Sequence, residues 1–235
     1  MTNEAVVQCD GSNVDAKLFE MSIVLVADQN DPSILNPDML RYKGIVDEAL
    51  NLSEPPLSMP VYSQVVYERG ITIRAEPNRF TFVQAGQPLD EDDCAIPKIA
   101  EHFVDQVSHI PYKAVGVNAK LFHPIGENST HRLTDCLIGS GGWASFKDVL
   151  PEIELKSMYR YEGRRITLDV GGVSEIMDGG AAEPGYLHQA NVHRDIGAND
   201  QRERIRMVLD IVGNWREDVS DIKRLVKKYQ SRILA

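Results

Sequence analysis

The chain has 235 residues, of which 43% are hydrophobic and 26% are charged. These fractions are ordinary for a folded globular protein and exclude an intrinsically disordered one, which is poorer in apolar residues. The formal net charge of −10 repels phosphate at long range, so it excludes general binding of nucleic acid by the whole surface.

The first residues and the cysteines indicate where the protein resides. Residues 1–15 show little periodicity, and we interpret them as a loose leader without the basic and apolar regions of a signal peptide. No run approaches the roughly 20 apolar residues that cross a bilayer. The cysteines, Cys9, Cys94 and Cys136, are odd in number and lack a Cys-x-x-Cys spacing, as is usual for reduced intracellular proteins. We therefore expect a cytoplasmic location and no membrane partner.

The next segment predicts a strand followed by a short helix. Residues 17–27 are rich in apolar and β-branched side chains and end at a breaker, residues 28–32, that closes with proline. Asn36 and Pro37 form an N-cap with proline at the first helical position. Gly44 keeps this helix short.

A three-strand antiparallel meander comes next. Its strands are predicted at residues 61–68, 71–76 and 80–84, with short turns between them. In the middle strand Ile71 and Ile73 alternate with Thr72 and Arg74, the pattern of a sheet with one buried and one wet face. A helix over residues 96–108 closes the unit with its apolar side chains on one side.

The same order of elements recurs in the second half. The hairpin sequence that begins at Tyr67 has an echo that begins at Tyr161, with one extra residue in its turn. Around this echo the pattern predicts strands at residues 112–122, 152–161, 164–171 and 186–196. It predicts helices at residues 129–138 and 200–215, and a loop at residues 174–184. Each half therefore has the order β-α-β-β-β-α, as expected of an internal duplication. The alternative is convergence, because strands and turns favour the same few residues in any hairpin.

The predicted fold class is α+β. Two similar halves, residues 16–110 and 111–215, are expected to form a largely antiparallel curved sheet with helices on one face. A C-terminal basic helix at residues 216–235 follows, with an apolar residue every three or four positions. This narrow seam either docks on the body or pairs with another helix.

The polar face of the sheet is the candidate binding surface. If the apolar residues of the hairpins face the helices, the alternating polar residues project from the other side. They are Thr72, Arg74, Thr167, Asp169, Gln189, Asn191, His193 and Asp195, and Lys223 and Lys227 of the C-terminal helix are further candidates for partner contact. This face is either simply solvated or a platform for a partner.

Histidines and carboxylates raise the alternative of a metal site. His193 and Asp195 share one side of the last strand, whereas His188 points to the other side. Asp169 on the neighbouring strand adds a third ligand if the register permits, although a closed zinc site takes four. The chain contains no nucleophile elbow and no P-loop, and we expect no cofactor.

The sequence favours a non-catalytic binding or adaptor subunit that presents the polar face and the C-terminal helix to a protein partner or to a second copy. Two alternatives stay open. One is a metal-assisted hydrolase or nuclease that uses His193, Asp195 and Asp169. The other is a nucleic-acid-binding protein that uses the C-terminal helix together with Arg74 and Arg79.

Overall fold

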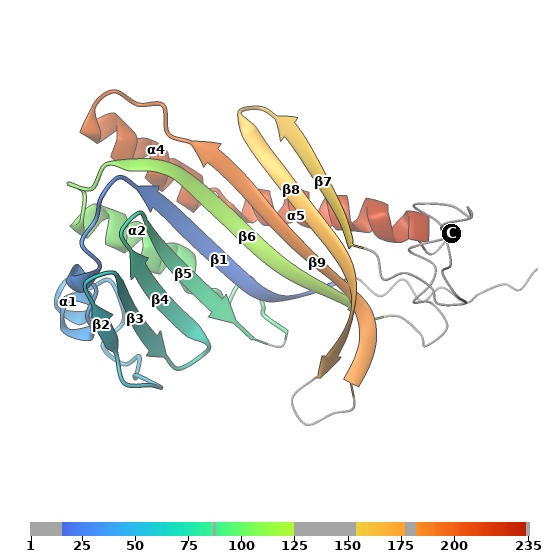
Figure 1. The fold of residues 1–235 in the computed structure, drawn as a ribbon, viewed down its shortest axis with the longest axis horizontal. Coiled ribbons are helices and arrows are strands. Elements are labelled where there is room, and N and C mark those ends of the chain that lie inside the picture. Colours follow the sequence, from blue (N-terminus) through green and yellow to red (C-terminus); the bar gives the residue numbers. More distant parts are fainter. Residues whose placement is uncertain (1–15, 87, 125–153, 177–181, 234–235) are drawn as a thin grey trace, which may run out of the picture.

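The computed structural model describes residues 16–86, 88–124, 154–176 and 182–233. The strands are β1 (Lys17–Ala27), β2 (Leu57–Met59), β3 (Tyr62–Tyr67), β4 (Ile71–Glu76), β5 (Arg79–Ala85), β6 (Tyr112–Pro124), β7 (Glu154–Tyr161), β8 (Arg164–Ile176) and β9 (Ala182–Asp195). The helices are the short 3-10 helix η1 (Pro32–Ile34), α1 (Pro37–Tyr42), α2 (Ile96–Gln106), α4 (Gln201–Gly213) and α5 (Trp215–Ile233). The strands form one sheet in the order β2-β3-β4-β5-β1-β6-β9-β8-β7, and all neighbours are antiparallel (Figure 1). The predicted α+β class and antiparallel sheet are confirmed.

The two halves of the chain meet in the middle of the sheet. β1 begins the first half and β6 the second, and these two strands pair along their length. A three-strand meander lies outside each of them, with β5, β4 and β3 beyond β1, and β9, β8 and β7 beyond β6. From the centre outwards the strand order is thus the same in both halves, and the short β2 is added to the first. The division at residues 110 and 111 falls between α2 and β6 and stays a prediction.

Local signals start the helices where the sequence predicts them. The Asn36 side chain accepts a hydrogen bond from the Met39 backbone N–H at 2.8 Å and caps α1. Asp200 accepts from the N–H groups of Arg202 and Glu203 and caps α4. Each cap satisfies backbone donors that have no partner inside the helix, so both helices begin at a defined residue.

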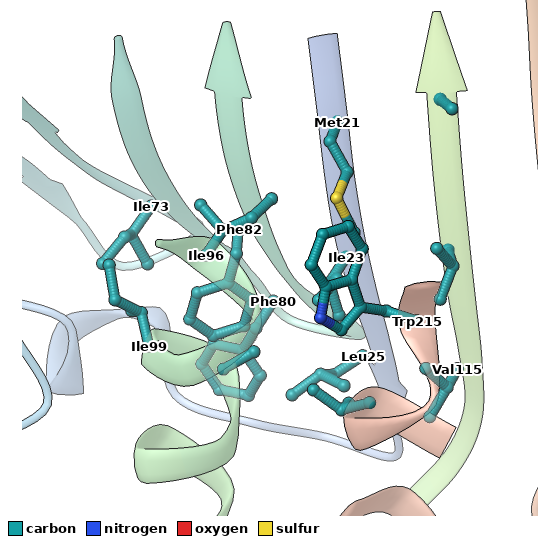
Figure 2. Packing of buried hydrophobic residues seen from close by; sticks show 14 of the residues in the cluster. Met21, Ile23, Leu25, Ile73, Phe80, Phe82, Ile96, Ile99, Val115 and Trp215 are labelled. Carbon is teal, nitrogen blue, oxygen red and sulfur yellow. The ribbon is translucent and has the colours of Figure 1, made fainter. Parts of the chain in front are cut away.

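The hydrophobic core lies between one face of the sheet and the helices α2, α4 and α5 (Figure 1). The ring centroid of Phe103 on α2 lies 4.7 Å from that of Phe80 and 5.3 Å from that of Phe82. Trp215, the first residue of α5, belongs to the same cluster as Ile23 of β1 (Figure 2). Burying each such side chain stabilises the fold by roughly 1.5–3 kcal/mol, which holds the helices on this face.

The C-terminal helix α5 docks on the body. Its seam residues Val219, Ile222 and Val226 are each at most 1% exposed and pack in the core cluster. Of the two predicted roles of the seam, docking is therefore the one that the structure shows. These apolar residues are not available for pairing with another helix.

The second hairpin differs from its prediction. β8 continues to Ile176 and β9 begins at Ala182. Residues 174–176 and 182–184, which belong to the loop predicted at 174–184, are therefore strand. The turns reverse the expected difference in length: three residues separate β3 from β4, whereas two separate β7 from β8. The extra residue of the echo therefore does not lengthen the turn, because Arg164 is already paired with Tyr161 in the strand ladder.

Some predictions fall on other parts of the chain. The leader at residues 1–15, the helix at residues 129–138, and both Cys9 and Cys136 lie outside the described residues. Of the helices that the structure does describe, none is both long and apolar enough to cross a bilayer.

Candidate functional site

The sheet face opposite α2, α4 and α5, which we call the open face, carries the predicted polar residues. Ile71, Ile73, Ile166 and Leu168 are buried on the helix side, so the residues between them project from the open face. Within the described ranges, no helix covers it (Figure 1). All the predicted sheet residues lie there: Thr72, Arg74, Thr167, Asp169, Gln189, Asn191, His193 and Asp195.

One row of residues across the open face is charged and internally paired. The strand register places Glu20, Lys120, Gln189, Asp169 and Lys156 side by side. Lys120 Nζ lies 3.0 Å from a Glu20 carboxylate oxygen, and Lys156 Nζ lies 3.1 Å from Asp169 Oδ2. Each charge in this row has an opposite charge beside it, an arrangement that stabilises neighbouring strands.

The next row is neutral and forms a hydrogen-bonded ladder. Asn191 Nδ2 donates to Asn118 Oδ1 at 2.5 Å, and Asn118 Nδ2 donates to the Ser22 carbonyl at 3.4 Å. Thr167 lies opposite Asn191 on β8. Residues of this row and of the charged row line a hollow of about 320 Å³. Its side-chain amides both donate and accept hydrogen bonds, as a polypeptide ligand requires.

The third row is basic. The register sets Arg160 opposite Arg165, and Arg165 opposite His193. A second hollow, of about 410 Å³, lies between these side chains and the turn at Gly163. In the part of the chain that the structure describes, no carboxylate lies within ion-pair distance of Arg160 or Arg165. Like charges directly opposite each other destabilise a strand pair, so an anion bound here would stabilise the sheet.

Charge is compensated unevenly over the open face. Arg74 extends the basic row to β4, where its Nε donates to the neutral Gln64 Oε1 at 3.0 Å. Four carboxylates on the open face already have nitrogen partners; they are Glu20, Glu76, Asp169 and Asp195. Glu154, at the start of β7, forms no ion pair with a described residue. Among the described residues, no carboxylate thus lies within ion-pair distance of Arg74, Arg160 or Arg165, in a chain whose net charge is −10.

The register separates the residues of the predicted metal site. His193 Nε2 and Asp195 Oδ1 lie 3.1 Å apart, but Arg165 rather than Asp169 stands opposite His193. Asp169 lies further along β8, about 13 Å away at the usual rise of a strand. No group of three or more metal-ligating side chains occurs in the described segments. The prediction that Asp169 joins His193 and Asp195 is therefore wrong.

Lys223 and Lys227 do not join the open face. They lie on α5, on the opposite side of the sheet, beside a hollow of about 320 Å³. Lys223 Nζ donates to Glu91 Oε1 at 2.5 Å, so part of the basic charge of α5 is already neutralised by the body. The nucleic-acid alternative combines the C-terminal helix with Arg74 and Arg79. These two arginines project from the open face, so they lie on the opposite side of the sheet from α5.

A buried charge cluster that sequence reasoning missed fixes α5 to the sheet. Asp218 is fully buried and accepts hydrogen bonds from both terminal nitrogens of Arg194 at 2.6 Å and from Arg164 Nη1 at 3.1 Å. Asp221 and Glu217 accept further bonds from Arg164 at 3.1 and 3.2 Å. The available signal was the three-residue spacing of Asp218 and Asp221, which places both on one side of a helix.

Two histidines are buried on the helix side of the sheet. His188 on β9 is 0% exposed, and His123 on β6 is 3% exposed. Leu121 stands opposite His188, so His123 is its diagonal neighbour. Neither ring nitrogen of His188 has a hydrogen-bond partner among the described residues. Burial lowers the pKa of His188 to about 4, and the nearby His123 adds to this shift, so His188 is neutral at pH 7.

Acid is expected to destabilise the protein through His188. Because its pKa in the folded state is below the value of 6.5 for a free histidine, the unfolded chain binds more protons as the pH falls. The stability is therefore complete above about pH 6.5 and declines towards pH 4, by about 2 kcal/mol or more. Urea unfolding at pH 7 and pH 4.5 should show this extra loss in the wild type and not in His188→Leu. Equal losses in both proteins would contradict the assignment.

Comparisons with known proteins give no family for this chain. It matches no protein-family model and no curated protein sequence. The geometry of the open face is therefore the basis on which a function can be inferred.

Proposed function

We propose that this protein is a non-catalytic binding subunit that holds an acidic segment of a protein partner on its open face. One observation supports the proposal above all: among the described residues no carboxylate lies within ion-pair distance of Arg74, Arg160 or Arg165, although the whole chain carries a net charge of −10. Attraction between a basic face and an acidic ligand speeds association and fixes the orientation of a complex. An adaptor depends on both properties.

The shape and chemistry of the open face suit an extended segment. The basic row crosses the sheet from β4 to β7. Between Arg74 and His193 it contains only Thr81, Val24 and Gly116, which are small or short. Guanidinium groups bind carboxylates through paired N–H donors. Beside them, the amides of Asn118 and Asn191 offer hydrogen bonds to the backbone of such a segment.

A charge reversal on the open face tests the proposal. The partner is first isolated with the wild-type protein from its native cell, and its Kd for each variant is then measured by isothermal titration calorimetry. Arg165→Glu is expected to weaken binding at least about tenfold, because a charged hydrogen bond is lost and a repelling carboxylate takes its place. The affinity of the wild type should also fall as salt is raised.

Arg206→Glu provides the matched control. Arg206 is an exposed arginine of α4, on the helix side of the sheet, so its reversal changes the net charge equally and leaves the open face intact. A photo-reactive residue at position 167 should cross-link to the partner, whereas one at position 206 should not. A wild type that retains no partner, or equal weakening by both reversals, would refute the proposal.

A further inference from the structure

β7 is an exposed edge of the sheet. It is the last strand in the sheet order, and β8 is its only neighbour among the described residues. The two-residue turn makes Tyr161 and Arg164 a hydrogen-bonded pair, so alternate residues back along β7 direct their backbone groups away from β8. The residues with outward-facing N–H and C=O groups are Arg160, Met158, Lys156 and Glu154.

Among the described residues, the opposite edge of the sheet is protected against pairing, whereas β7 is not. β2 has three residues and follows Pro55 and Pro56, and proline cannot donate to a neighbouring strand. β7 has eight residues and contains neither proline nor glycine. It also carries three large exposed side chains, Met158 (52% exposed), Tyr159 (39%) and Tyr161 (56%). Proteins usually blunt such an edge, because it pairs readily with another strand.

The charges of β7 are complementary to β7 itself. Glu154 and Arg160 are exposed near the two ends of the strand, and neither forms an ion pair with any residue that the structure describes. If β7 pairs antiparallel with a second copy about Ser157, each Arg160 lies opposite Glu154 of the second copy. In the same register Leu155 lies opposite Tyr159 of the second copy, an aliphatic and aromatic pair that stabilises a sheet. A shift by two residues would instead set Lys156 opposite a basic residue, Arg160 or its own equivalent.

We propose that two copies of this chain associate through β7, antiparallel about a two-fold axis at Ser157. The axis is perpendicular to the sheet, so the two open faces lie on the same side of one continuous sheet. The outward backbone groups of the two edges form the hydrogen bonds between the copies, and the pairs of Arg160 with Glu154 fix the register. The inference does not rest on the proposed function, because its tests need no other protein. Of the three arginines of the basic row, the dimer uses Arg160 alone, and Arg74 and Arg165 keep their places on the open face.

A cysteine at the axis tests the pairing directly. In this register Ser157 forms a non-hydrogen-bonded pair with its own equivalent, which sets their Cα atoms about 4.5 Å apart, within the span of a disulfide. The purified full-length Ser157→Cys protein should form a disulfide-linked dimer under mild oxidation, well beyond any formed by the native Cys9, Cys94 and Cys136. Tyr159→Cys is the control, because its equivalent in the second copy would lie about 13 Å away.

Charge reversals test the register. Arg160→Glu should raise the dimer Kd at least about tenfold in sedimentation velocity, because two carboxylates then lie opposite each other. Glu154→Arg should have the same effect. The double variant Glu154→Arg/Arg160→Glu should restore the dimer, whereas Arg206→Glu on α4 should leave the wild-type Kd unchanged.

A backbone variant separates pairing from folding. Met158→Pro removes an outward N–H without removing a bond to β8, so it should abolish the dimer while the circular dichroism spectrum stays that of the wild type. The proposal is overturned if the wild type stays monomeric at high concentration. It is also overturned if Ser157→Cys and Tyr159→Cys cross-link equally, if the double charge variant stays monomeric, or if the dimer survives Met158→Pro.

Discussion

Replacing Asp218 with alanine is expected to lower the free energy of unfolding by about 3–5 kcal/mol, the usual cost of removing one partner from a buried ion pair. The Asp218 carboxylate is fully buried and receives both terminal nitrogens of Arg194 at 2.6 Å. Its loss also removes a bond from Arg164, whose side chain is only 7% exposed. Because the arginines belong to the sheet and Asp218 belongs to α5, the docking of α5 should be weakened most.

Asp92→Ala is the matched control for this experiment. Asp92 also links the body to α5, through Arg216 at 2.9 Å, but its side chain is 87% exposed, and exposed pairs contribute only about 0–1 kcal/mol. Urea denaturation followed by circular dichroism gives the free energy of unfolding for both variants. Similar losses in the two would show that the buried cluster does not hold α5 in place.

The strands and helices were predictable because the order of apolar and polar residues in each one follows which of its side chains are buried. Ile71 and Ile73 are buried while Thr72 and Arg74 are not, as their alternation indicates. Residues 17–27 and 71–76 form β1 and β4 with the predicted limits, since breakers bound both segments. The same local reasoning assigned the polar residues of the candidate site to one face of the sheet.

Relations between strands were not predictable in the same way. The residue that stands opposite His193 depends on the pairing of β8 with β9, and a shift of register changes every neighbour across the sheet. The hydrogen bond between Asp218 and Arg194 likewise depends on where α5 crosses β9. The spacing of apolar residues along the sequence does not predict this position. The sequence therefore indicated which residues share the open face, but not which charges on it remain without a partner.

The hairpin echo marks equivalent turns whose surroundings differ. Gly70 and Gly163 both have positive φ, +68° and +72°, a conformation that favours glycine. A Cβ on Gly70 would overlap the carbonyl oxygen of Ala85, at the end of β5, whereas a Cβ on Gly163 would meet no atom of the described chain within 4 Å. The two turns thus separate the cost of backbone conformation from the cost of close packing.

Gly70→Ala is expected to lower the free energy of unfolding by about 3 kcal/mol or more, and Gly163→Ala by only about 1–2 kcal/mol. Both variants place an alanine in the left-handed region, which accounts for the smaller loss. Only Gly70→Ala also forces its methyl group against the backbone of Ala85, so it must shift the pairing of β4 with β5. Urea unfolding measures both losses, and their difference reports the contact with Ala85. Equal losses would mean that β5 yields to the methyl group and that φ alone requires glycine in both turns.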